Sequence, residues 1–336
     1  MNAKEISTRI DVLDYLRGFA LMGIILVNII PLLSVKLPIP STSDASYLRF
    51  LYLFVEGRFY TIFTFLFGVG FYIFISRANA KGKNGYVLFL RRILVLFIFG
   101  LVHVQFHPGE ALTVYAICGL IILPFYKANK VVNLVFGMVM LLVLSLYAQK
   151  MFMVVPLMLL GIAAGQYRLF ERISDQWKVT AIFTGGMFVL CVAGLIYQYQ
   201  HAPFAFGSGG ESIETQQFLR IGITIGPIVS AFYIGLMILL LNCPVVRKVL
   251  SPLKSYGRMA LTNYVSQTIL ILVAGKMLDL FDHITNLQSL YFCLAIYVIQ
   301  LTFSSIWLHH FSFGPLEWGW RTMTYFEFPP MRKTRV

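Results

Sequence analysis

Three polar side chains interrupt the first long apolar segment of the chain. Asp14 and Arg17 lie near its start, and Asn28 lies deep inside it. Eleven residues of α-helix make almost three turns and about 16 Å, so Arg17 and Asn28 share one face. Asp14 precedes Arg17 by three residues, the spacing of a helical ion pair, and Gly18 and Gly23 leave room for a neighbouring helix. This face could bind an anion or line a reaction site. The alternative is an arginine that extends to the lipid headgroups, with Asn28 bonding a neighbouring helix.

A second polar set follows in the run GLVHVQFHPGE, at the end of a later apolar segment. Imidazole titrates near neutral pH, so His103 with the nearby carboxylate of Glu110 is a candidate general base. The alternative is an imidazole that only bonds a backbone carbonyl or Tyr115. His103, His107 and Glu110 superficially resemble a metal-ligand set, but Pro108 is expected to break the helix between them. We therefore predict no metal site.

A third polar set opens the second long apolar segment, where Glu56, Arg58 and Tyr60 put an acid, a base and a phenol close together. A charged side chain at the centre of a bilayer costs roughly 2.5 to 3.5 kcal/mol, so such residues usually face protein or water. Arg58 and Tyr60 are therefore candidates for substrate binding.

Composition sets the class of protein that holds these residues. Hydrophobic residues make up 58% of the 336 and charged residues only 12%, which is too little polar surface to cover a soluble globule. The chain is predicted to be an integral membrane protein. Its net charge of +13 then indicates basic loops beside anionic lipid rather than nucleic-acid binding. The four cysteines have no close spacing, so neither a disulfide framework nor a thiolate site is expected.

About ten apolar segments are long enough to cross a bilayer, which takes about 20 residues of helix. They are residues 16–35, 58–76, 89–107, 111–126, 131–148, 152–168, 179–198, 218–242, 258–278 and 287–310. The prediction is an all-α, polytopic membrane protein in which residues 1–336 form a single transmembrane domain. An aromatic amphipathic segment near 47–55 is expected to lie at the interface, and residues 311–336 to form a cytoplasmic tail.

The distribution of lysines and arginines predicts how these segments are oriented in the membrane. With a cytoplasmic N-terminus, 21 of the 27 fall in inner segments, so the positive-inside rule predicts that both termini are cytoplasmic. No cleavable signal peptide is visible, because acidic as well as basic residues precede the first apolar segment and no small-residue cleavage site follows it. The first span is expected to stay in the protein.

Several stretches carry a resemblance to a known family. The runs LDYLRG, GRFYTIFTFLFG, GRMALTNYVSQ and GPLEWGWR together resemble the YeiB family of bacterial multi-span membrane proteins, a domain of unknown function. Members usually have Asp where this chain has Glu110, a difference that keeps the carboxylate. The resemblance implies a multi-pass protein of the bacterial plasma (inner) membrane, surrounded by membrane lipid.

That family is similar, in fold and in the motif of its first helix, to membrane acyltransferases that move an acyl group from a cytoplasmic carrier to an acceptor outside. In one branch an arginine is followed, after ten residues, by a catalytic histidine, and here Asn28 takes that place after Arg17. Another branch, resembling lysosomal heparan acetyltransferase, also has Asn there and uses a histidine in the next loop. Residues 29–48 contain none, so the base is expected to be His103.

The leading hypothesis from this resemblance is a transmembrane acyltransferase with acyl-CoA as co-substrate and no covalently bound cofactor. Arg17, paired with Asp14, would bind the donor, Asn28 would stabilise the oxyanion, and His103 with Glu110 would deprotonate an acceptor hydroxyl or amine. The acceptor is a small molecule, a glycan or a lipid. Two alternatives stay open: a proton-coupled transporter or exporter of a small anionic solute, and a noncatalytic lipid-binding protein. A homo-oligomer is compatible with each.

Overall fold

Helices form almost all of the regular structure. The computed structural model describes residues 10–171, 176–206 and 212–333. Among these residues the only β-pairing is an isolated bridge between Phe311 and Arg332. An all-α fold is what an apolar chain requires, since a helix bonds its own backbone polar groups where no water can do so. The all-α part of the predicted fold class is confirmed.

The helices occupy every one of the ten segments predicted to cross the membrane. In chain order they are α2 (Asp11–Leu32), α3 (Ser43–Phe54), α4 (Arg58–Ala80), α5 (Gly85–His103), α6 (Ala111–Ile122), α7 (Lys130–Leu146), α8 (Val154–Gln166), α9 (Trp177–Gln200), α10 (Ile213–Leu241), α11 (Pro244–Val249), α12 (Ser251–Arg258), α13 (Ala260–Met277), α14 (Asn286–His310) and α15 (Pro315–Tyr325), with 3-10 helices at Leu123–Lys127 and Lys150–Met153.

Six helical stretches of the described chain are long and apolar enough to cross a membrane. They are Asp11–Leu32, Ser43–Ala80, Gly85–His103, Trp177–Gln200, Ile213–Leu241 and Asn286–His310. Three shorter apolar helices lie at Ala111–Lys127, Lys130–Leu146 and Lys150–Gln166. These helices make the chain a membrane protein. The count of ten spans, the side on which the termini lie and the boundaries of the single domain stay predictions.

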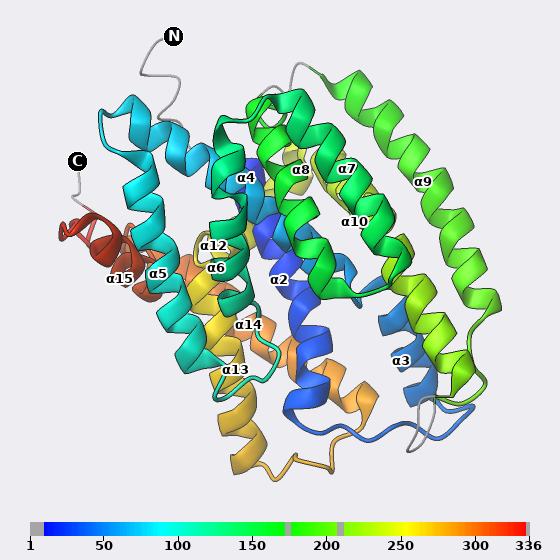
Figure 1. The fold of residues 1–336 in the computed structure, drawn as a ribbon. Helices are drawn as coiled ribbons and strands as arrows, with labels where there is room; N and C mark the ends of the chain where they lie inside the picture. Colours follow the sequence, from blue (N-terminus) through cyan, green and yellow to red (C-terminus); the bar gives the residue numbers. More distant parts are fainter. Residues whose placement is uncertain (1–9, 172–175, 207–211, 334–336) are drawn as a thin grey trace.

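Helix α2 lies in the middle of the bundle (Figure 1), where it packs against α4, α12, α13 and α14. Half of its residues are buried, whereas α9, at the edge of the bundle in Figure 1, has only three buried residues. Apolar side chains of α9 such as Ile182, Val189 and Ile196 are more than half exposed, as expected for a helix that faces lipid. The polar face of α2 therefore points into protein.

Local signals set the ends of the helices that surround α2. The side chain of Thr42 accepts a hydrogen bond from the N–H of Ala45 at the start of α3, and Asn84 caps α5 in the same way. Gly57 has a φ of +77°, a left-handed conformation that suits glycine, and it turns the chain from α3 into α4. The predicted interfacial segment 47–55 thus falls on α3 and the turn that follows it.

Two glycines allow α2 and α12 to cross in direct backbone contact. A Cβ atom on Gly18 would overlap the carbonyl oxygen of Leu253, and one on Gly257 would overlap the carbonyl oxygen of Asp14. Gly23 lies under the ring of Phe59 in the same way. The predicted role of Gly18 and Gly23, to let neighbouring elements approach, is confirmed.

Gly257→Ala is expected to lower the thermal stability of the purified protein, because the added methyl group must push α12 away from α2. Overpacking of this kind costs about 1 to 3 kcal/mol. The matched control is Gly226→Ala in α10, where a Cβ would meet no atom within 4 Å. Differential scanning fluorimetry in detergent would measure both variants. Equal melting temperatures for wild type and Gly257→Ala would contradict the close crossing.

Candidate functional site

A cavity of about 1220 Å³ lies beside α2 and is lined by residues from widely separated parts of the chain. Its walls come from α2, α4, α5, α6, α12, α13 and α15, together with residues 148–151 and Ile223 of α10. Five of the seven candidate site residues named from the sequence line it: Asp14, Arg17, Asn28, Tyr60 and Glu110. Arg58 and His103 do not. The structure thus brings most of the predicted residues together around one space.

The polar face of α2 has the geometry expected from its spacing. Arg17 Nη1 lies 3.1 Å from Asp14 Oδ1, and the Asp14 side chain is only 1% exposed. Asn28 follows nearly three turns along the helix and lines the same cavity. The predicted ion pair and the shared face are both present. Arg17 therefore extends into a protein cavity rather than lying only among headgroups.

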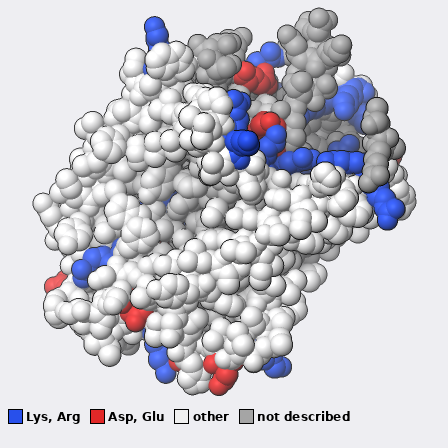
Figure 2. Space-filling model, turned by 180° about the vertical axis from the view of Figure 1, so that it is seen from behind, with Lys and Arg blue, Asp and Glu red and all other residues white. Residues whose placement is uncertain are grey.

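Seven basic side chains line one end of the cavity, which we call the basic vestibule. They are Arg17, Arg77, Lys81, Lys83, Arg92, Arg258 and Arg321. Lys and Arg side chains gather around a hollow on one part of the molecular surface, with acidic side chains among them, while most of the face is uncharged (Figure 2). Two of the seven are ion-paired, Arg17 with Asp14 and Lys83 with Glu327. Such a concentration of positive charge inside a low-dielectric wall favours a polyanionic ligand. Only Arg17 of these seven is among the candidate site residues named from the sequence, because the others lie on α4, the turn after it, α5, α12 and α15, which only the fold brings together.

Helix α15 is fixed across this vestibule by an arginine and a tryptophan. The Arg92 guanidinium lies 3.5 Å from the ring centroid of Trp320, and the indole N–H of Trp320 donates to the Arg92 carbonyl oxygen at 2.7 Å. Arg92 also lies 4.9 Å from the ring of Phe74 on α4. A cation over aromatic faces keeps its charge while losing water. The terminal run GPLEWGWR therefore does more than anchor the chain at the interface, because it builds part of the cavity wall.

Glu317 fastens the start of α15 to the start of α13. Its carboxylate accepts hydrogen bonds from the backbone N–H groups of Leu261 and Thr262 at 2.7 and 3.0 Å and from the Thr262 hydroxyl at 2.6 Å. These N–H groups have no partner within their own helix, so Glu317 caps α13 from another element. Burial raises the pKa of Glu317, and the hydrogen bonds from Thr262 and Leu261 act against that rise.

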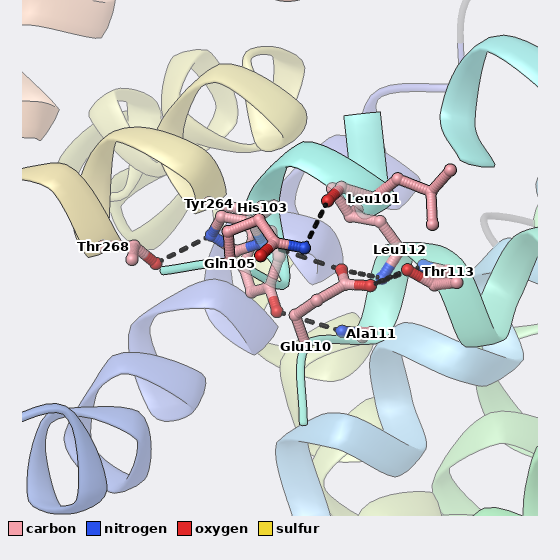
Figure 3. A network of polar contacts seen from close by, with 9 residues as sticks. All are labelled: Leu101, His103, Gln105, Glu110, Ala111, Leu112, Thr113, Tyr264 and Thr268. Atoms are coloured by element: carbon pink, nitrogen blue, oxygen red, sulfur yellow. Dashed lines mark hydrogen bonds and ion pairs between the residues drawn. The ribbon is translucent and has the colours of Figure 1, made fainter. Parts of the chain in front are cut away.

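The other end of the cavity holds Glu110, shown with its neighbours in Figure 3. The Glu110 carboxylate accepts from the N–H of Thr113 at 2.7 Å and from the N–H of Leu112, and so caps α6. Burial alone would raise the pKa of Glu110, but His103 and the Thr113 hydrogen bonds outweigh it and hold the pKa below its ordinary value. Glu110 is therefore a stable carboxylate.

His103 lies behind Glu110 rather than on the cavity wall. Its Nε2 is 2.9 Å from the Thr268 hydroxyl, and its Nδ1 is 3.6 Å from a carboxylate oxygen of Glu110. Its ring packs edge-on against Tyr264. Among the described residues, the hydrogen-bond partner of His103 is the hydroxyl of Thr268 rather than a backbone carbonyl or Tyr115. The expectation that the imidazole of His103 shares the open space with Arg17 and Asn28 does not match this geometry.

His107 is the imidazole that lines the cavity. Its ring stacks on His103 with centroids 5.5 Å apart, and its Nδ1 is buried with no hydrogen-bond partner in the described part of the chain. Burial and the neighbouring His103 lower the pKa of His107 to about 4, so the ring is neutral at pH 7. The spacing of His103 and His107 by four residues signalled a shared face, but not which ring would meet the cavity.

Arg58 joins three helices outside the cavity. Its guanidinium is 1% exposed and donates to the carbonyl oxygens of Glu56 and Gly222 at 2.7 and 3.0 Å and to the side chain of Gln198 at 2.8 Å. These acceptors tie α4 to α9 and α10. They also offset the cost of burying the charge. The structure therefore gives Arg58 a packing position, whereas Tyr60, two residues on, lines the cavity.

An aromatic and aliphatic section separates the two polar ends. Tyr60, Phe63 and Phe67 on α4 face Tyr115 on α6, with ring centroids 5.3 to 6.1 Å apart, and all four line the cavity. Leu66 and Val27 add aliphatic wall. This section suits a hydrocarbon chain. Among the described residues no group of three His, Cys, Asp or Glu side chains could hold a metal ion.

Two family models match adjoining parts of the chain. Residues 164–327 match the family described as protein of unknown function (DUF418). Residues 9–171 match the model described as heparan-alpha-glucosaminide N-acetyltransferase, catalytic. The second match includes the first helix and the segment with His103, His107 and Glu110. The chain is therefore similar to a catalytic domain of the transmembrane acyltransferase type.

Three bacterial proteins are similar over nearly the whole chain. The uncharacterized 39.9 kDa protein in the amylase 3′ region of Bacillus acidopullulyticus is 60% identical and is aligned over 97% of this chain and 96% of its own. YxaH of Bacillus subtilis (strain 168) is 27% identical, with 98% and 97% covered. YeiB of Escherichia coli (strain K12) is 26% identical, with 93% and 95% covered. No solved structure matches the chain significantly.

The low pKa of His107 predicts a loss of stability in mild acid. An unfolded imidazole titrates near pH 6.5, whereas folded His107 titrates at about 4. As the pH falls from 6.5 towards 4, protons bind the unfolded state first, so the folded state loses stability. At pH 5 this amounts to about 2 kcal/mol.

His107→Gln removes that group, so its melting temperature is expected to fall less than that of wild type between pH 7 and pH 5. The matched control, His283→Gln, changes an imidazole that is 69% exposed and is expected to follow wild type. Scanning fluorimetry at both pH values measures the difference. Parallel losses in all three proteins would refute a depressed pKa at His107.

Proposed function

Because the chain belongs to the YeiB (DUF418) family and its first half is similar to an acetyltransferase catalytic domain, we propose that it is a transmembrane acyltransferase. The donor is an acyl-CoA-type thioester bound at the basic vestibule, and the acceptor reacts near His107 and Glu110. One observation supports this most: a single cavity has seven cations at one end and an imidazole with a carboxylate at the other. Donor and acceptor would approach from opposite ends.

The basic vestibule has the chemistry for a phosphorylated carrier. Phosphate oxygens form strong charge-assisted hydrogen bonds with guanidinium groups. Arg17 would take one such contact while its pairing with Asp14 fixes its direction. Arg321, which lies over the rings of Phe313 and Tyr325, offers another. The acyl chain would then extend along the aromatic section, and the donor needs no cofactor held covalently by the protein.

The transfer step uses residues on the cavity wall. The acceptor oxygen or nitrogen attacks the thioester carbonyl, a C–O or C–N bond forms, and the C–S bond breaks. The amide of Asn28 donates a hydrogen bond to the oxyanion that develops. Neutral His107 takes the acceptor proton and returns it through water to the thiolate that leaves, so that free thiol and a neutral imidazole result. Glu110, held anionic, and His103 behind it stabilise the imidazolium that forms in between.

The proposed setting is the bacterial plasma (inner) membrane with the basic vestibule on the cytoplasmic side. The three full-length relatives are bacterial proteins. Positive residues concentrate in cytoplasmic segments of membrane proteins, and acyl-CoA is made inside the cell. The His107 end would then face the outer side, where the acceptor is supplied.

Transport of a small anionic solute uses the same cavity and stays the competing proposal. Arg17 and Asn28 would bind the solute, and His103 with Glu110 would couple its movement to protons. A third reading is a lipid-binding protein without activity. A transporter exchanges labelled solute across proteoliposomes without cleaving a thioester, whereas the enzyme releases free thiol from acyl-CoA.

Purified protein in nanodiscs is expected to hydrolyse acetyl-CoA slowly, with water replacing the acceptor, and His107→Ala is expected to lower kcat by 10²- to 10⁴-fold, the usual contribution of a general base. Thiol release followed with a chromogenic disulfide measures the rate. His283→Ala, at an exposed site, is the matched control and keeps wild-type activity. Hydrolysis that is unchanged in His107→Ala would remove His107 from the mechanism.

Arg17→Gln is expected to raise the KM for acetyl-CoA about tenfold with a smaller change in kcat, because a charged hydrogen bond to phosphate contributes about 1.5 kcal/mol. Lys276→Gln, an exposed cation at the end of α13, serves as the control. Steady-state kinetics over a range of donor concentrations separates the two parameters. A fall in kcat with no change in KM would place Arg17 at the reacting carbonyl instead of at the phosphates.

A further inference from the structure

A second, open groove of about 520 Å³ lies where α7, α9 and α10 meet. Figure 1 shows these three helices on one flank of the bundle. Five of the ten residues that line the groove are aliphatic, namely Leu146, Ala148, Ile213, Ile221 and Ile225, and four are polar or charged. Leu146 is 73% exposed and Ile213 83% exposed. Aliphatic side chains so exposed on transmembrane helices meet lipid, so the groove opens into the bilayer.

One charged side chain lines this groove. Arg220 lies on α10 with Gln216 and Gln217 one turn before it, and all three line the groove. Seven residues separate Arg220 from the start of the helix at Ile213, about 10 Å. This is close enough to the helix end for the guanidinium to reach the headgroup level. Within the described residues no ion pair or side-chain hydrogen bond involves the Arg220 guanidinium.

The groove also adjoins the acceptor end of the main cavity. Ala148 lines both spaces, and its neighbours Gln149 and Lys150 line the cavity. On the other side, Ile221 and Thr224 line the groove while Ile223 lines the cavity. The Thr224 hydroxyl donates to the carbonyl oxygen of Ser145 at 3.0 Å and holds α10 against α7 at this point. A headgroup bound at Arg220 would thus lie beside the wall that leads to the reaction site.

From these observations we propose that the groove binds a single anionic membrane lipid, and that the headgroup of this lipid is the acyl acceptor. The lipid chains lie along the aliphatic wall, and the phosphate pairs with Arg220. A hydroxyl of the headgroup reaches past Ala148 into the cavity. A free phosphate would not use the aliphatic wall, and a neutral lipid would not use Arg220. Lipid binding in the groove does not depend on the proposed acyltransferase function, whereas the acceptor role of the lipid rests on that function.

Native mass spectrometry of the full-length protein tests binding without any donor. Phosphatidylglycerol carries a phosphate and free headgroup hydroxyls, and phosphatidylcholine with the same chains serves as the neutral-charge comparison. Wild type is expected to hold phosphatidylglycerol about fivefold more tightly, the effect of one cation near a lipid headgroup. Arg220→Gln is expected to abolish the preference, and Ile221→Trp, which fills the groove, to weaken both lipids.

Lys276→Gln, which removes an exposed cation elsewhere, is the matched control and should keep the preference. Equal binding of the two lipids by wild type would overturn the proposal. So would an unchanged preference in Arg220→Gln, or a loss in Lys276→Gln as large as in Arg220→Gln.

The acceptor role is tested with radiolabelled acetyl-CoA and nanodiscs that contain phosphatidylglycerol. The acceptor role is supported if wild type transfers label to the lipid extract and Arg220→Gln does not, while Arg220→Gln still releases thiol by hydrolysis. Thiol release without labelled lipid in wild type overturns the acceptor role and leaves the acyltransferase intact. If wild type shows no thiol release and no labelled lipid while phosphatidylglycerol still binds, the acyltransferase proposal and the acceptor role are both overturned. The lipid-binding site then still stands.

Discussion

The polar face of α2 cannot face hydrocarbon, and the rest of the structure depends on that constraint. A carboxylate, a guanidinium and an amide on one transmembrane helix need protein or water around them. The fold meets this need by placing α2 at the centre, with Gly18 and Gly257 allowing α12 to pack directly against it. The polar face, which lies beside this contact on the helix, borders the cavity. Once α2 is fixed in this way, Asp14, Arg17 and Asn28 must point into the same space.

The two ends of that space differ in charge. In the proposed reaction this difference would separate donor binding from proton transfer. At one end seven cations and three carboxylates, Asp14, Glu317 and Glu327, line the cavity, so positive charge is in excess, and Arg92 and Arg321 lie over aromatic rings. At the other end a buried carboxylate is saturated by backbone N–H groups and a neutral imidazole keeps an unpaired nitrogen. A cluster of fixed positive charge can hold a ligand but cannot accept its proton. A neutral imidazole can accept a proton but attracts no anion.

The sequence predicted the fold class, the helical segments and the face of α2, because apolar length and helical spacing depend only on neighbouring residues. It also singled out Glu110 and Tyr60, which line the cavity. It did not predict that His107, rather than His103, would line the cavity, since α5 ends at His103 and sequence spacing cannot show how the turn that carries His107 packs. Arg92, Arg258 and Arg321 were missed for the same reason: each looks like an ordinary interfacial cation until the fold gathers them. Arg58 was expected at a binding site, but its acceptors come from α9 and α10, 140 and 164 residues away in the chain.

The cavity is lined by residues from both parts of the chain that the two family models match. The acetyltransferase match ends at residue 171 and the DUF418 match begins at 164. The first part supplies α2, α4, α5 and α6, with the reactive residues of the proposal. The second supplies Arg258, Tyr264, Trp320 and Arg321. Trp320 is bonded to Arg92 across this boundary, and Thr268 to His103. Five of the seven cations of the basic vestibule lie in the first part, and the second part adds Arg258 and Arg321, so neither part encloses the space alone. A difference in substrate between this family and the acetyltransferase is therefore expected to lie in α13 and α15.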